Sequence, residues 1–167
     1  MLKFSTKADT LQAVREKTKK FKVLPQVSFT VRNLIKSPES IMERITSELH
    51  SKYFIVRSSA ISEDSEHQSL AGAYLSVMDV TEATLPDAVN RVMDSFGDNN
   101  PENQILVQPM LEGVSMSGVL FTMDPNSGGH YFVINYDESS STDSVTSGES
   151  GTSARYIFHG KTIGNNQ

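Results

Sequence analysis

The chain of 167 residues contains no cysteine. This absence excludes disulfides, cysteine-ligated zinc sites and thiol nucleophiles, so stability must come from packing and chemistry from other groups. No apolar run approaches the roughly 18–20 residues that a membrane-spanning helix needs, and residues 1–7 lack the apolar core of a signal peptide. We therefore expect a cytoplasmic protein with no membrane partner.

Cations are scarce in the second part of the chain. Residues 58–167 hold 3 Lys and Arg against 15 Asp and Glu, whereas residues 1–57 hold 12 against 5. Two interpretations remain open: solvated surfaces of opposite charge that attract each other, or a basic part that faces a polyanion such as a nucleotide triphosphate. The lysines of residues 17–22 carry no series of interleaved stacking aromatics, so we expect no nucleic-acid partner.

Hydrophobic periodicity predicts about three helices and a β-rich second half. Helices are expected over residues 8–21, from Ser37–Pro38 to Leu49, and from Leu85 to Phe96 with a capping box at Thr84 and Asp87. Strands are expected at residues 23–31, 53–56, 73–80, 104–110, 118–123, 130–135 and 155–158. Turn residues at 124–129 predict a hairpin, and residues 137–153, rich in Ser, Thr, Gly and acids, predict a flexible loop. The pattern favours an α+β fold with a mixed or antiparallel sheet.

The stretch from Tyr53 to Gly72 is typical of an anion site. An apolar run is expected to end at Arg57, which leaves a guanidinium and the hydroxyls of Ser58 and Ser59 at the strand edge. Small residues at the end of the stretch let backbone approach a ligand closely. Lys7 beside the first predicted helix opposes the helix macrodipole, so it is either solvated at a frayed end or shares a phosphate with backbone N–H groups.

Three segments carry a resemblance to a known family. They read FSTKADTL (residues 4–11), VRSSAISEDSEHQSLAG (56–72) and ILVQPMLEGVSMSGVLFTMDPNSGG (105–129). In this order they resemble the N-terminal ATP-binding domain of the pyruvate phosphate dikinase and phosphoenolpyruvate synthase family. The resemblance implies an ATP-grasp-like fold, ATP as the bound nucleotide, and Mg²⁺ whose ligands lie mostly outside this chain.

The resemblance also implies roles for individual residues. Lys7, Arg57 and Ser58 would contact the triphosphate, with Arg57 also acting in catalysis, Gly72 would allow backbone approach, and Gln108 would lie along the nucleotide pocket. Asp143 stands where the family has a glutamate, and we assign no metal ligand within the chain. Without the resemblance, Gln108 is interpreted as a polar residue on a solvated edge strand. The nearby Asp124 favours a turn-forming role over metal binding.

Family enzymes continue into further domains, including one with a phosphorylated histidine. We therefore expect an N-terminal fragment, an incomplete domain that is inactive alone, with a basic αβ part at about 1–57, a nucleotide-site and β-rich part at 58–136, and a loop at 137–153. Its partners would be the remaining domains and a small phosphoryl acceptor, pyruvate or an amide. Two alternatives stay open: part of an amide kinase such as an L-glutamine kinase, suggested by SSTD at 140–143, or a non-catalytic regulatory module.

Overall fold

The computed structural model describes residues 6–61, 64–65, 68–69, 75–98, 100–124, 127–138 and 154–159. The chain divides into two compact units, unit 1 (Met1–Met110) and unit 2 (Leu111–Gln167). The compositional boundary at Arg57 does not coincide with this division, because a continuous strand of unit 1 passes through it. Within the described residues, no helix combines the length and the apolar character needed to cross a membrane.

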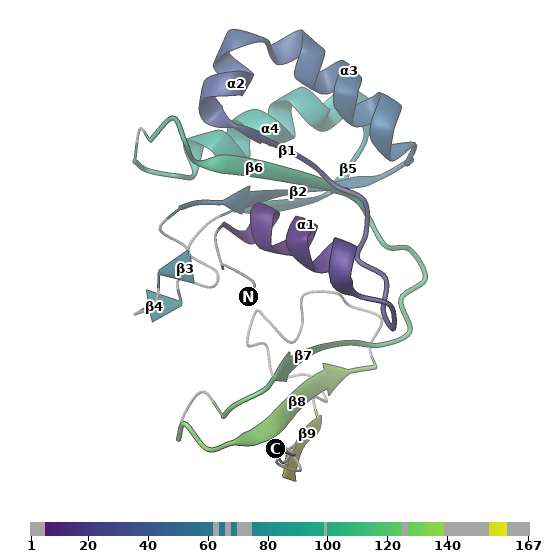
Figure 1. The fold of residues 1–167 in the computed structure, drawn as a ribbon. Coiled ribbons are helices and arrows are strands. Elements are labelled where there is room, and N and C mark those ends of the chain that lie inside the picture. The colour runs from purple at the N-terminus through teal and green to yellow at the C-terminus, as the bar shows by residue number, and fades with distance from the viewer. Residues whose placement is uncertain are drawn as a thin grey trace. The chain divides into compact units, whose positions relative to one another are not determined.

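Unit 1 is built on a four-stranded antiparallel sheet with the strand order β1–β6–β2–β5. Its strands are β1 (Val27–Thr30), β2 (Phe54–Ser59), β5 (Ser76–Val80) and β6 (Gln104–Pro109). One face of the sheet is covered by α2 (Val31–Lys36), α3 (Pro38–Leu49) and α4 (Leu85–Asp94), and the other by α1 (Lys7–Lys17), as Figure 1 shows. The unit also contains the short 3₁₀ helix η1 (Glu82–Thr84) and the ribbon of β3 (Asp64–Ser65) and β4 (Gln68–Ser69).

The hydrophobic core lies between this sheet and the layer of α2, α3 and α4. Alternate strand residues project to one face, so Phe54 and Val56 of β2 meet Ile105 and Val107 of β6 on the core side. Helix α3 contributes Ile41, Ile45 and Leu49, and α4 contributes Leu85, Ala88, Val89 and Val92. The apolar spacing of three to four residues in both helices explains why each buries one stripe.

Helix α3 confirms the sequence prediction closely. Ser37 is the N-cap residue although it makes no side-chain cap hydrogen bond, and Pro38 occupies the first turn. The side chains of Ile41, Ile45 and Leu49 are buried, and the helix ends at His50, whose φ of 42° is left-handed. The predicted capping box at Thr84 and Asp87 is wrong. The reciprocal contacts join Thr81 and Thr84, because η1 adds a turn ahead of α4: the Thr81 N–H donates to Thr84 Oγ1 at 3.0 Å.

Three boundaries differ from the predictions for physical reasons. Helix α1 ends at Lys17 rather than at residue 21, because Thr18 adopts an extended conformation, and the side chain of Phe21 is 67% exposed. Strand β1 stops at Thr30, whose Oγ1 accepts from the N–H of Asn33 at 3.1 Å and caps the unpredicted helix α2. Strand β2 continues to Ser59 instead of ending at Val56, because β6 pairs with it along that whole length.

Unit 2 contains a three-stranded antiparallel sheet of β7 (Ser117–Phe121), β8 (Tyr131–Asp137) and β9 (Ala154–His159). The pairing of β7 with β8 confirms the predicted hairpin. A Cβ atom on Gly118 would lie 2.7 Å from the backbone oxygen of Asn135, so this position of β7 requires glycine. The described residues contain four α-helices and antiparallel sheets, which confirms the α+β class and adds α2 to the expected helices.

Candidate functional site

The face of the unit 1 sheet that α1 covers, called the α1 face below, carries most of the polar strand residues. Residues that stand opposite each other in an antiparallel pair project to the same side. The register of β2 and β6 therefore defines the α1 face by three opposed pairs: Ile55 with Gln108, Arg57 with Leu106, and Ser59 with Gln104. Apart from Ile55 and Leu106, these side chains are polar or charged.

The start of α1 is bound to one end of this face by side-chain hydrogen bonds. Thr6 is the N-cap residue, and its Oγ1 accepts from the N–H of Asp9 at 3.3 Å. The same hydroxyl donates to Oε1 of Gln104 at 2.9 Å, and the N–H of Ala8 donates to Oγ of Ser59 at 2.9 Å. The polar ends of β2 and β6 thus fix the position of the first turn of the helix.

Lys7, the first residue of α1, lies against β2 through its side chain. Its Nζ donates to the carbonyl oxygen of Ser58 at 3.4 Å. This contact brings the ammonium group to the peptide between Ser58 and Ser59, so both predicted phosphate-binding cations lie at the C-terminal end of β2. A positive charge at a helix N-terminus is unfavourable by itself. The carbonyl oxygen of Ser58 partly compensates the positive charge of Lys7. An anion bound beside the ammonium group would compensate it further.

Arg57 is half-buried, and its Nε is a buried donor with no hydrogen-bond partner among the described residues. A buried donor that is left unpaired costs about 1–3 kcal/mol. A buried acceptor without a partner among the described residues is Oε1 of Gln26, whose Nε2 donates to the Ala8 carbonyl oxygen at 2.8 Å, so this side chain faces α1 as well. The chemistry of Arg57 fits an anion, because a guanidinium presents several donors in a rigid fork.

Gln108 lies on the same face as Arg57 and is only 7% exposed. The interpretation of this residue as a polar group on a solvated edge strand is wrong, because β6 is an internal strand between β1 and β2.

The side chain of Ser58 points away from the α1 face. Ser58 stands opposite Ile105 and projects its buried side chain to the core side. Only its backbone carbonyl reaches Lys7, so its hydroxyl lies on the other side of the sheet from the Arg57 side chain.

Sequence reasoning missed Gln104, which binds the first turn of α1, and it did not separate the roles of Ser58 and Ser59. Strand alternation would have found Ser59, since a strand that presents Arg57 to the site presents Ser59 and not Ser58. That signal was hidden because the strand was expected to end at Val56. The predicted residues Gly72 and Asp143 lie outside the described residues.

Asp124 forms the turn between β7 and β8. Its Oδ2 accepts from Oγ of Ser127 at 2.6 Å and from the hydroxyl of Tyr131 at 2.9 Å, and its backbone pairs with Gly129. These contacts support the turn-forming role. Among the described residues, no three His, Asp or Glu side chains come together as a group that could hold a metal ion.

Comparison with known proteins identifies the family. No curated protein matches the chain. The family described as "Pyruvate phosphate dikinase, AMP/ATP-binding domain" matches residues 3–139, which is well over half of the 167 residues and includes the α1 face. The chain therefore belongs to the pyruvate phosphate dikinase AMP/ATP-binding domain family.

Proposed function

We propose that the α1 face binds the phosphate groups of ATP within a dikinase-like phosphotransferase of the pyruvate phosphate dikinase or phosphoenolpyruvate synthase type. ATP would supply a phosphoryl or pyrophosphoryl group, and the acceptor would be a histidine on another domain. The membership of an AMP/ATP-binding family supports the nucleotide. The observation that carries the proposal is the buried, unpartnered Nε of Arg57 on a face where Lys7 also lies.

Arg57 has the central role in this proposal. Its guanidinium stays charged at every physiological pH and can bind two phosphate oxygens at once, which orients the nucleotide and neutralises its charge. Binding there would give Nε the acceptor that the described residues do not provide. Because phosphoryl transfer depends mainly on positioning and charge stabilisation, the same contact would contribute to catalysis.

Lys7 would add a second positive charge at the same end of β2. Its position depends on α1, whose first turn is bound by Ser59 and Gln104, so these two residues would position Lys7 rather than touch the nucleotide. Gln108 would offer an amide on the same face. We place the ligands of any Mg²⁺ outside the described residues, which contain no suitable cluster.

The test is calorimetric titration of the 167-residue chain with ATP and Mg²⁺. A hydrogen bond to a charged group contributes about 1.5–3 kcal/mol, so Arg57→Ala should weaken ATP binding by roughly 10- to 100-fold. The matched control is Arg91→Ala, which removes an exposed arginine from α4 on the far side of the sheet and should leave the affinity unchanged. Equal ATP affinity for the parent and Arg57→Ala, or no binding by either, contradicts the proposal.

We also propose that this chain alone does not turn ATP over, because the acceptor histidine would lie on another domain. Purified chain incubated with ATP and Mg²⁺ should release neither AMP nor phosphate above the buffer background. Sustained ATP consumption that Arg57→Ala abolishes would overturn this proposal while supporting the assignment of the binding site.

A further inference from the structure

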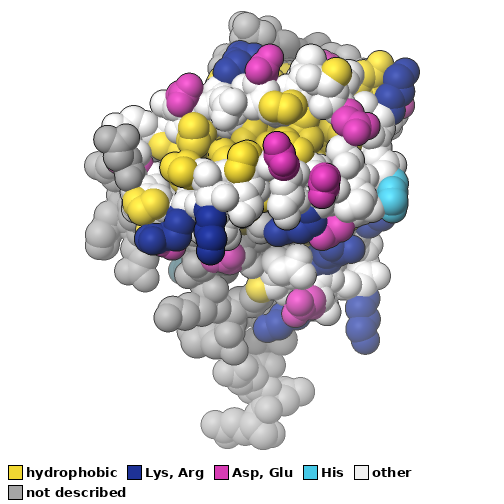
Figure 2. Space-filling view, turned by 90° about the horizontal axis from the view of Figure 1, so that it is seen from above, with side chains coloured by type: hydrophobic (Ala, Val, Ile, Leu, Met, Phe, Trp, Pro, Cys, Tyr) yellow, Lys and Arg dark blue, Asp and Glu magenta, His cyan; other side chains and the backbone are white. Residues whose placement is uncertain are grey.

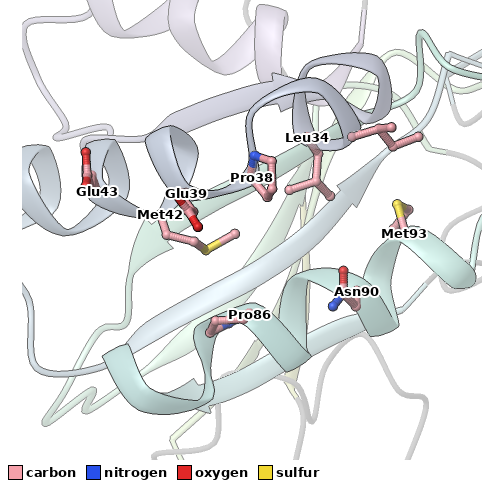
Figure 3. Close-up of a pocket in the computed structure, with 9 residues that line it drawn as sticks. Leu34, Pro38, Glu39, Met42, Glu43, Pro86, Asn90 and Met93 are labelled. Atoms are coloured by element: carbon pink, nitrogen blue, oxygen red, sulfur yellow. The ribbon is translucent and has the colours of Figure 1, made fainter.

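An apolar groove lies on the other side of the unit 1 sheet, away from Lys7 and Arg57. Its main hollow, about 580 Å³, is bounded by α2, α3 and α4, with Leu34, Met42 and Met93 among its lining residues (Figure 3). An adjoining hollow of about 360 Å³ shares Ile35 and Met93 with it. We call the two together the helical groove.

The helical groove is lined largely by apolar side chains. Ile35 is 70% exposed, and Figure 2 shows hydrophobic side chains gathered near the centre of this face, with both acidic and basic side chains around them. Contiguous apolar surface rimmed by polar groups marks an interaction site more often than scattered single residues do. The groove therefore calls for an occupant with an apolar anchor.

The charges that line the groove indicate which charge its occupant should carry. Every ionisable residue that lines it is acidic, and the four are Glu39, Glu43, Asp94 and Asp98. The ion pairs of Arg32 with Glu102 and of Arg44 with Glu48 use no groove carboxylate, and Asp98 accepts a hydrogen bond from Nδ2 of Asn103 at 2.6 Å. Complementary charge steers association and fixes which partner is accepted. An apolar anchor flanked by cations would complement this lining.

The chain itself carries such an anchor. Residues 17–22, KTKKFK, follow α1 and are called the lysine–Phe21 segment. Phe21 is 67% exposed, and the four lysines around it, Lys17, Lys19, Lys20 and Lys22, are exposed as well. Thr18 Oγ1 donates to the Phe21 carbonyl at 3.4 Å, which holds the segment in a turn that presents the ring.

The segment and the groove of one molecule lie on opposite sides of the same sheet. Helix α1, from which the segment leads, covers one face, whereas α2, α3 and α4 form the groove on the other (Figure 1). A molecule therefore has the sheet between its own Phe21 and its own groove. We infer that the helical groove binds the lysine–Phe21 segment of a second copy of this chain, in a head-to-tail contact that is independent of the proposed ATP site.

The first test is sedimentation equilibrium of the 167-residue chain over a wide range of concentrations. Association should be reversible and should weaken about tenfold or more when the salt concentration rises from about 0.05 M to about 0.5 M, because the charges are exposed. Phe21→Ser, and separately Glu39→Lys with Glu43→Lys, should each abolish it. The matched controls, Leu111→Ser for the exposed anchor and Glu82→Lys with Glu112→Lys for the charge, should associate like the parent.

Mixing the two variants that should not self-associate, Phe21→Ser and the Glu39→Lys, Glu43→Lys protein, tests the head-to-tail geometry directly. Phe21→Ser keeps an intact groove and the Glu39→Lys, Glu43→Lys protein keeps an intact segment, so an equimolar mixture should form a one-to-one dimer that grows no further. Circular dichroism of each variant confirms that it is folded. The inference is overturned if the parent stays monomeric throughout, if the control variants lose association equally, or if the mixture stays monomeric.

Discussion

The two faces of the unit 1 sheet differ in composition although the same strands build them. On the core side, β2 and β6 present Phe54, Val56, Ile105 and Val107 to three helices. On the α1 face the intervening residues include Arg57, Ser59, Gln104 and Gln108, and a single helix covers them. Apolar contacts hold the first side together, whereas side-chain hydrogen bonds to α1 hold the second.

With the ATP site proposed above, this difference would separate stability from nucleotide binding within one strand. Burial of apolar area is the main stabilising contribution to folding, so the core side should account for most of the free energy of unfolding of unit 1. The α1 face contains buried polar atoms without partners among the described residues, which a fold selected only for stability would avoid. Neighbouring residues of β2 should therefore respond differently to substitution.

The largest effect is expected from Phe54→Ala on the core side. The Phe54 ring is fully buried in the core cluster, so its removal should lower the free energy of unfolding by about 3–5 kcal/mol. Urea unfolding followed by circular dichroism measures it. The control Phe21→Ala removes a ring that is mostly exposed and should change stability by less than about 0.5 kcal/mol. A loss below about 1 kcal/mol for Phe54→Ala would show that the core side is not the stabilising one.

A smaller effect is expected from Ser59→Ala on the α1 face. The substitution leaves the buried N–H of Ala8 without its acceptor, at a cost of about 1–3 kcal/mol. The same urea experiment applies, with Ser47→Ala on the exposed side of α3 as the matched control. Unchanged stability of Ser59→Ala would mean that the first turn of α1 is not held by β2.

The smallest effect is expected from Thr6→Ala, which removes the N-cap of α1 and the contact with Gln104. Loss of an N-cap lowers stability by about 1 kcal/mol. Thr6→Ser keeps the hydroxyl and should restore most of this loss. If serine and alanine destabilise the protein equally, the methyl group of Thr6 and not its hydrogen bonds is responsible.

Local signals in the sequence predicted the elements whose causes are local. Pro38 and the stripe of Ile41, Ile45 and Leu49 predicted α3, and the turn residues at 124–129 predicted the β7–β8 hairpin. The family resemblance also predicts Arg57 and Lys7 as phosphate-binding residues, and Lys7 contacts β2 in the structure.

Long-range pairing determined what the sequence did not reveal. Strand β2 extends through Ser59 because β6, nearly fifty residues later, pairs with its whole length. Without that partner the apolar run ends at Val56, and the alternation that separates Ser58 from Arg57 cannot be applied. The start of α2 depended on the Thr30 side-chain cap within a segment whose composition favoured a strand.

The most direct test of whether the core side provides stability and the α1 face binds ATP uses two adjacent residues of β2, Val56 and Arg57. For each alanine variant we would measure the free energy of unfolding in urea and, under conditions where it is folded, the affinity for ATP with Mg²⁺. Val56→Ala should lose about 2 kcal/mol of stability and keep the ATP affinity of the parent. Arg57→Ala should change stability by less than about 1 kcal/mol and bind ATP at least about tenfold more weakly. Two results would contradict this separation of stability from binding. In one, both variants are less stable and both keep the ATP affinity of the parent. In the other, both variants lose ATP affinity to the same extent.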